Sequence, residues 1–177
     1  PQRILILGGG FAGMFTAREL KKQLGDKVEV ELIDEENYFI FQPLLPEVAA
    51  GSITALHAVS PLRFLLRNVF VRKARVDSVD FKDKTVTVFQ GVQRRPTIIP
   101  YDQLIVAMGQ QVDLSRTPGL SDHALTLKNL EDARRLRAHV IESLEHAEIT
   151  QLPEIKKEAL TFCVMGLVSL VLKQSAK

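Results

Sequence analysis

Three glycines near the start of the chain, Gly8, Gly10 and Gly13, have the spacing G-x-G-x-x-G. They follow an apolar run typical of a buried strand, residues 4–7, and Asp34 stands about 20 residues beyond the last of them. In a βαβ unit the first glycine permits a tight turn, the second leaves out a Cβ that would block a pyrophosphate, and the third lets the helix pack on the strand. The acid can accept a hydrogen bond from a ribose hydroxyl, which slightly disfavours a 2′-phosphorylated nucleotide. The spacing therefore predicts a site for the diphosphate of a dinucleotide.

The residues between the glycines and the acid complete the order strand, helix, strand. Apolar residues recur at helical spacing from Ala12 to Leu24, and Gly25 stands where such a helix would end. Residues 28–33 read as the second strand. The helix would direct the free N–H groups and the positive dipole end of its first turn at the phosphates. A glycine-rich turn without a ligand is the alternative, and the complete order argues against it.

Composition excludes several other classes of protein. The chain has 177 residues, 46% of them apolar and 25% charged, as in soluble globular proteins. Its net charge of +2 and scattered basic residues argue against nucleic-acid binding. The single cysteine, Cys163, excludes a disulfide framework and a cysteine metal site. The histidines lack the spacing of metal ligands, so we expect them on the surface and expect no metal site; they are His57, His123, His139 and His146.

We expect neither a secretory signal nor a transmembrane segment. The sequence begins inside a strand, at Pro1, and its longest apolar run, residues 160–172, is too short to span a bilayer. The first half of that run, residues 160–165, has the composition of a buried strand.

The remaining pattern predicts an α/β fold: a Rossmann-like parallel sheet with helices, plus a small antiparallel β insertion over about residues 69–101. The continuous apolar run 104–107 suits a buried parallel strand. The densest basic group, Arg72, Lys73 and Arg75, is expected on the outer face of a strand. Further expected elements are an irregular but apolar segment over 35–60, a short helix from a Ser60 cap with Pro61 at its first position to Leu66, a helix over 130–147 capped by Asn129, and a polar linker over 151–158.

Three stretches resemble the type II NADH:quinone oxidoreductases, within the flavoproteins that carry two dinucleotide-binding domains. Residues 6–13 and 101–109 are similar to motifs shared across those flavoproteins. Residues 38–49, Tyr-Phe-Ile-Phe-Gln-Pro-Leu-Leu-Pro-Glu-Val-Ala, are similar to a stretch more specific to the quinone-reducing branch. The resemblance covers residues 1 to about 166.

The resemblance implies FAD as cofactor and assigns residues to it, while catalytic residues stay unassigned. The glycine turn would hold the pyrophosphate, Asp34 the adenosine ribose, and the backbone of Val76 the adenine. The end of the last parallel strand would pass close to the ADP moiety, and two residues of the 38–49 stretch would lie near the flavin. The implied cofactor-binding residues are Gly8, Gly10, Phe11, Ala12, Gly13, Asp34, Pro43, Leu44, Val76, Ala107, Met108 and Gly109.

The same resemblance implies the chemistry and its partners. Disulfide reductases of this group place a cysteine pair beside the flavin, but residues 42–46 contain no cysteine, and Cys163 alone is a poor candidate for sulfide oxidation. Direct hydride transfer from NADH to the flavin, and then electrons to a membrane quinone, is the chemistry that remains. The intact relative would be a peripheral enzyme on the inner face of the cytoplasmic membrane, without a transmembrane segment; a homodimer is left open.

The resemblance also sets the expected domains. These are an FAD-binding domain over 1–127, a connecting helix and linker over 128–158, and over 159–177 the first strand of a truncated NADH-binding domain with an aberrant tail. A second glycine motif is expected from about Val164, but the sequence departs from it after Gly166. A frame shift near Gly166, a natural short product and a fragment cut at a domain boundary are three explanations. The chain alone is then expected not to turn over NADH.

Two other functions also fit the sequence. One is a non-catalytic or defective nucleotide-binding product. The other is an NAD(P)H-dependent flavoprotein reductase for a different acceptor, such as a ferredoxin or a small electron carrier.

Overall fold

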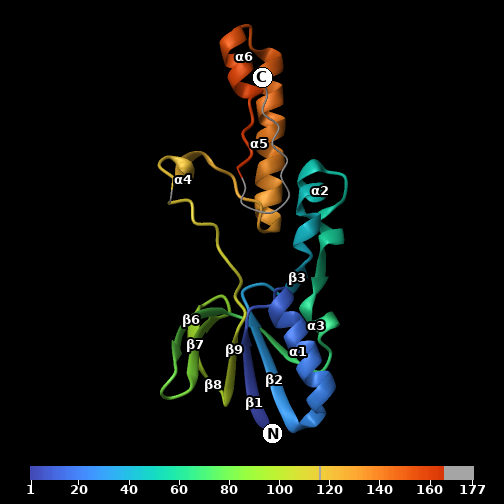
Figure 1. The fold of residues 1–177 in the computed structure, drawn as a ribbon, viewed down its shortest axis with the longest axis vertical. Helices are drawn as coiled ribbons and strands as arrows, with labels where there is room; N and C mark the ends of the chain where they lie inside the picture. The colour runs from blue at the N-terminus through green and yellow to red at the C-terminus, as the bar shows by residue number, and fades with distance from the viewer. Residues whose placement is uncertain (116, 166–177) are drawn as a thin grey trace. The chain divides into compact units, whose positions relative to one another are not determined.

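A four-stranded parallel sheet forms the centre of the fold in the computed structural model, which describes residues 1–115 and 117–165 (Figure 1). Its strand order is β5-β2-β1-β9, and each neighbouring pair is parallel. Helix α1 (Phe11–Leu24) connects the first two strands of the chain, as the sequence predicted. The strands are β1 (Gln2–Leu7), β2 (Val28–Asp34), β5 (Phe70–Lys73) and β9 (Gln103–Val106). The predicted Rossmann-like α/β fold is confirmed.

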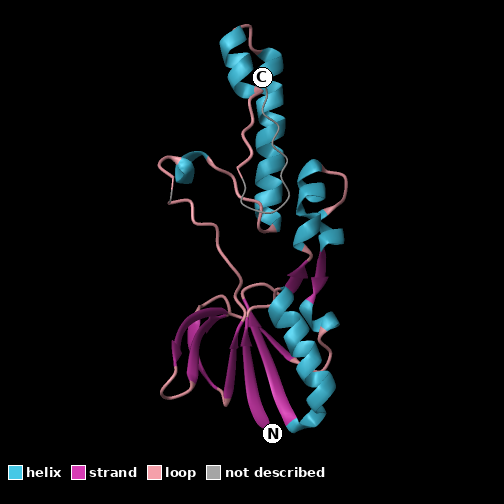
Figure 2. Ribbon diagram, in the orientation of Figure 1, coloured by secondary structure: helices cyan, strands magenta, loops and turns pink. Residues whose placement is uncertain are grey.

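The sheet is covered on both faces because alternate residues of its central strands point to opposite sides. Ile6 of β1 packs with Met14 and Ala17 of α1 on one face. Leu5 and Leu7 of the same strand pack on the other face with the insertion, where Val86, Val88 and Ile99 lie. Figure 2 shows α1 and the insertion on opposite sides of the sheet.

The insertion is a three-stranded antiparallel sheet of β6 (Arg75–Asp80), β7 (Thr85–Gln90) and β8 (Arg95–Pro100). The β structure predicted over residues 69–101 is present, but its first strand, β5, pairs with β2 in the parallel sheet. Strand β9 is parallel as predicted, yet it is only partly buried, and Val106 is 60% exposed. The reason is that β9 is an edge strand of the described sheet.

The segment expected to be irregular, residues 35–60, contains short regular elements. They are β3 (Tyr38–Ile40), a 3-10 helix (Gln42–Leu44), α2 (Leu45–Ala50), a second 3-10 helix (Ala55–Ala58), β4 (Val59–Pro61) and α3 (Leu62–Leu65). The predicted helix start is wrong by one residue, because Ser60 pairs with Phe39 in the β3–β4 ladder. Pro61 is therefore the N-cap, and the helix begins at Leu62.

Helices follow the sheet: α4 (Leu120–His123), α5 (Leu130–Ile149) and α6 (Pro153–Ala159). The predicted Asn129 cap is confirmed, because its Oδ1 accepts a hydrogen bond from the Asp132 N–H at 2.8 Å. Residues 151–158, predicted as a polar linker, contain most of α6. Pro153 starts this helix, a position that suits proline because its missing N–H needs no partner there. Of the described residues, none forms a helix able to cross a membrane.

The strand predicted over residues 160–165 is not formed, and these residues are mostly exposed. A strand has to pair its backbone groups with a neighbour, and among the described strands none pairs with this segment. The altered tail and the frame-shift hypothesis lie outside the described residues. The chain divides into two compact units, Pro1–Leu136 and Arg137–Lys177, and the boundaries expected at residues 127 and 158 stay predictions.

A buried carboxylate links three parallel strands. Glu31 of β2 is 4% exposed, and its Oε2 lies 2.7 Å from Arg3 Nη2 of β1. Its Oε1 accepts a hydrogen bond from Arg72 Nε of β5 at 2.5 Å. Arg72 also donates to Gln90 Oε1 at 3.0 Å, and Gln90 donates to Thr97 Oγ1. The network therefore ties the parallel sheet to the insertion, and Arg72 is not simply a surface cation as the sequence suggested.

We expect Glu31→Gln to lower the free energy of unfolding by about 3 kcal/mol, because both guanidinium groups would keep their charge without a counter-charge. Urea unfolding followed by circular dichroism measures this loss. Glu29→Gln is the matched control, since Glu29 is exposed on the same strand and forms no ion pair among the described residues. Its change should stay within about 0.5 kcal/mol. Equal losses in the two variants would show that the buried charge does not stabilise the sheet.

Candidate functional site

Two of the three predicted glycines are required by packing at the turn between β1 and α1. Gly8 has φ +106°, and a Cβ there would lie 2.3 Å from the carbonyl oxygen of Ala107. A Cβ on Gly13 would lie 1.8 Å from the carbonyl oxygen of Gly8. Both distances are far below van der Waals contact, so strand, helix and turn approach this closely only because these side chains are absent.

Gly10 is different, because a Cβ added there would meet no atom within 4 Å. Packing does not require this glycine, and the space beside it is open. That is the arrangement predicted for the glycine that leaves room for a phosphate group.

Gly9 is a packing residue that the motif did not single out. A Cβ there would lie 2.7 Å from Leu62 Cδ1 and 3.2 Å from the Asp34 side chain. The only signal for it in the sequence is the unbroken run of three glycines, which does not reveal that α3 lies against the turn.

Within residues 1–115 and 117–165, no side chain caps the backbone amides in the first turn of α1. Gly10 is the N-cap, no side chain caps the helix, and the first turn has no acidic residue. Phe11 and Ala12 are exposed there. Free amides and the positive end of the helix dipole are the features that bind an anion, so the turn can hold a diphosphate.

Asp34 lies beside the turn, as predicted, and its carboxylate is held by the backbone. Its Oδ2 accepts a hydrogen bond from the Gly9 N–H at 2.5 Å, and its Oδ1 accepts one from the Glu36 N–H at 2.7 Å. Each carboxylate oxygen can accept a further bond, so a ribose hydroxyl can still be accommodated. The side chain thus also positions the glycine turn.

The end of β2 is acidic. Glu35 and Glu36 follow Asp34 directly and are exposed. The pKa of Tyr38 is raised, first by burial and then by the negative charge of Glu36, so this phenol keeps its proton at neutral pH. Part of this negative charge is compensated, because Lys73 lies 3.6 Å from Glu36 and Arg75 lies 3.8 Å from Glu35.

The end of β9 reaches the same turn. The Ala107 N–H donates to the carbonyl of Leu7 at 2.7 Å. Met108 is 60% exposed, and Gly109 has φ +72° with open space where a Cβ would stand. The structure therefore brings Ala107 and Met108 beside the glycine turn, and Gly109 directly follows them.

The remaining predicted residues lie further from the turn. Val76 is half-buried in β6 and packs against the core below the insertion. Pro43 and Leu44 lie in the 3-10 helix after β3, where Leu44 packs against Leu45 and Val48. Among the described residues, no hydrogen bond or ring contact connects Val76, Pro43 or Leu44 with the glycine turn.

An aromatic cluster connects that segment with α1. The ring of Phe11 lies 4.9 Å from Phe39 and 5.6 Å from Phe41, centroid to centroid, and 6.4 Å from Phe15. Phe41 directly precedes the segment that contains Pro43 and Leu44, so these ring contacts hold its start next to the first turn of α1. The motif predicted a cofactor role for Phe11 but not this structural one.

The described residues contain no candidate metal site. No group of three or more metal-binding side chains gathers in residues 1–115 or 117–165. All four histidines are exposed, as predicted. Cys163 is an exposed free cysteine, and not part of a buried strand as predicted.

Comparison with known proteins gives a consistent picture. The family described as pyridine nucleotide-disulphide oxidoreductase matches residues 2–152. The external alternative NAD(P)H-ubiquinone oxidoreductase B3, mitochondrial, of Arabidopsis thaliana is 35% identical and covers 93% of this chain. The type II NADH:quinone oxidoreductase NdhA of Mycobacterium tuberculosis is 34% identical, also over 93% of this chain. The chain spans 30% and 34% of these two relatives.

A solved structure agrees with these relatives. The NDH2 structure from Plasmodium falciparum in complex with RYL-552 has a TM-score of 0.76 and 25% sequence identity. The match covers 89% of this chain and 32% of that protein.

We expect Gly13→Ala and Gly10→Ala to differ sharply in stability. The Gly13 variant should lose about 3 kcal/mol or more, because its methyl would overlap the Gly8 carbonyl. The Gly10 variant should lose at most about 1 kcal/mol, the cost of alanine at an N-cap. Thermal and urea unfolding of the two purified variants measure the difference. Comparable losses would mean that the turn is packed in another way.

Proposed function

The chain belongs to the pyridine nucleotide-disulphide oxidoreductase family, and from that membership we propose that its glycine turn binds the diphosphate of FAD. The open space at Gly10, in front of an uncapped helix, is the observation that carries the proposal. Neighbouring atoms occupy the space beside Gly8, Gly9 and Gly13. Among these four glycines of the turn, only Gly10 therefore leaves room for a phosphate.

In this proposal the predicted residues contact different parts of FAD. The amides of Gly10, Phe11 and Ala12 donate to the phosphates, while Gly8 and Gly13 allow the close packing that aims those amides. Asp34 accepts a hydrogen bond from a ribose hydroxyl. Its Oδ2 also accepts the hydrogen bond of the Gly9 N–H and so orients that amide. Val76 contacts the adenine, residues 107–109 contact the ADP moiety, and Pro43 and Leu44 contact the flavin.

We further propose that the chain contributes the flavin-binding part of an NADH:quinone oxidoreductase. Bound FAD supplies a carrier that takes a hydride from NADH and passes two electrons to a quinone. The family and the names of the relatives support this chemistry. The absence of any cysteine from residues 42–46 supports it too, because a thiol relay beside the flavin is then not available.

The proposed setting follows from the same activity. A quinone resides in a membrane, so the enzyme would act as a peripheral protein on the inner face of the cytoplasmic membrane. Sedimentation of the chain without membranes tests for a homodimer, and sedimentation with membranes tests for peripheral attachment.

We expect the purified chain to bind FAD, and Gly10→Ala to weaken that binding about hundredfold, because the methyl would occupy the place of a phosphate and cost roughly two charge-assisted hydrogen bonds. Quenching of flavin fluorescence during titration measures both affinities. Lys22→Ala is the control, since Lys22 is exposed near the far end of α1; it should bind FAD as the wild type does. A folded chain that binds no FAD, or a Gly10→Ala variant that binds FAD normally, would refute the assignment.

A further inference from the structure

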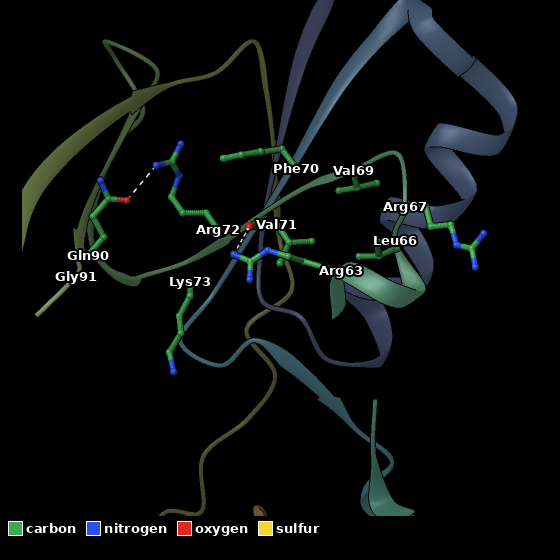
Figure 3. Close-up of a pocket in the computed structure, with 10 residues that line it drawn as sticks. All are labelled: Arg63, Leu66, Arg67, Val69, Phe70, Val71, Arg72, Lys73, Gln90 and Gly91. Atoms are coloured by element: carbon green, nitrogen blue, oxygen red, sulfur yellow. Dashed lines mark hydrogen bonds between the residues drawn. The ribbon is translucent and has the colours of Figure 1, made fainter. Parts of the chain in front are cut away.

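The cavity at the outer edge of β5 does not gather its side chains into one binding site (Figure 3). It has a volume of about 660 Å³ and lies between α3 and the end of β7. Arg63 Nη2 donates to the carbonyl of Val71 at 3.2 Å, and Figure 3 shows the side chain of Arg67 turned to the other side. In the aromatic cluster on α1, by contrast, the ring contacts meet at a single residue, Phe11.

Phe11 takes part in two regions of the proposed FAD site. Its backbone N–H lies in the first turn of α1, directly after the Gly10 N-cap, where no side chain caps the amides. Its ring contacts Phe39 edge to face and Phe41 at a tilt, with 4.9 and 5.6 Å between the ring centroids. One residue therefore connects the glycine turn with the segment that follows β3.

The backbone passes the position of Phe41 on to the residues after it. Phe41 is the N-cap of the 3-10 helix Gln42–Leu44. Its N–H donates to the carbonyl of Ala58 at 2.8 Å, and its own carbonyl accepts a hydrogen bond from the Leu44 N–H at 3.0 Å. Among the hydrogen bonds and ring contacts of the described residues, only those of Phe11 connect the first turn of α1 with residues 39–44.

The cluster is anchored on one side and open on the other. Phe39 is 8% exposed and belongs to the core that contains Ile6 and Met14. Phe11 and Phe41 are 39% and 43% exposed, so both rings keep a free surface. The contact between these two rings is thus held in place from the core, while its outer side is accessible beside the glycine turn.

We propose that Phe11 is a positioning residue for the flavin end of bound FAD. Its amide contacts the diphosphate, and its ring sets the place of Phe41, and hence of Pro43 and Leu44, relative to that diphosphate. The inference rests on the proposed FAD site and adds that one side chain couples the two ends of the cofactor. ADP has the diphosphate but no flavin, so its binding should not depend on the ring.

The competing explanation is that the Phe11 ring only stabilises the fold by packing. In that case its removal would weaken the binding of ADP and FAD alike, in proportion to the stability that is lost. The ratio of the two affinities separates the explanations.

Calorimetric titration of the 177-residue chain with FAD and with ADP tests the proposal. We expect Phe11→Ala to weaken FAD binding about tenfold, because two aromatic contacts are lost, and to leave the ADP affinity within about twofold. The shift of the flavin absorption bands on binding should also become smaller. Circular dichroism and thermal unfolding check that the variant remains folded.

Phe15→Ala is the matched control. Phe15 is 44% exposed on the same helix, and its ring contacts Phe11 but neither Phe39 nor Phe41. We expect both affinities and the flavin spectrum of this variant to stay those of the wild type, within about twofold.

Hydrogen exchange followed by NMR tests the same coupling without a ligand. The amides of Phe41 and Leu44 should exchange about fivefold faster or more in Phe11→Ala than in the wild type, because the segment loses a contact that holds it. The exchange of both amides should not change in Phe15→Ala. Unchanged exchange in Phe11→Ala would overturn the inference whatever the chain binds.

The outcomes also separate this inference from the proposed function. A wild-type chain that binds neither ADP nor FAD contradicts the proposed function, and the inference with it. Where the wild type binds FAD, an unchanged FAD affinity in Phe11→Ala, or equal losses for ADP and FAD, overturns the inference alone. A wild type that binds ADP as tightly as FAD, without a spectral shift, overturns it too, because the flavin is then not held.

Discussion

The rest of the structure depends on one contact, in which the backbone of Gly13 in α1 lies directly against the carbonyl oxygen of Gly8 at the end of β1. No methyl group fits between them, so the helix leaves the strand at one distance and in one direction. That direction places the amides of its first turn in front of the open space at Gly10. Asp34 then closes the turn from β2, and Ala107 closes it from β9. A local steric constraint thus brings together three strands that are distant in sequence.

The buried carboxylate of Glu31 fixes the pairing of a further strand, β5, with β2. Strand β5 has four residues, and of these only Val71 is buried. A strand with so little apolar surface gains little from burial in any particular register. The bond between Arg72 and Glu31 supplies the missing selectivity, because a slip by one residue would place the arginine on the opposite face and leave the carboxylate with one partner. Here a buried ion pair serves to define the pairing.

Much of this organisation could be read from the sequence where the signal is local. The strand, turn, helix and second strand of residues 2–34 follow from periodicity and from glycine spacing, and Asn129 follows from capping chemistry. The β3–β4 pair and the place of β5 could not be predicted, because both depend on partners distant in the chain. Residues 160–165 are the opposite case: their composition suits a strand, but the described chain provides no neighbour to pair with them. The packing role of Gly9 could not be predicted either, because it depends on the position of Leu62, which no motif gives.

The two edges of the parallel sheet differ in how open they are to a further strand. At β5 the guanidinium of Arg63 occupies the Val71 carbonyl, so an incoming chain finds an acceptor already taken. At β9 the side chain of Val106 is exposed, and the described residues place no strand beyond it. Extension of the sheet by a further strand is consequently favoured from one side only. A second copy of the chain can then add only through its own β9, which is the identical edge, so such growth ends in a closed pair.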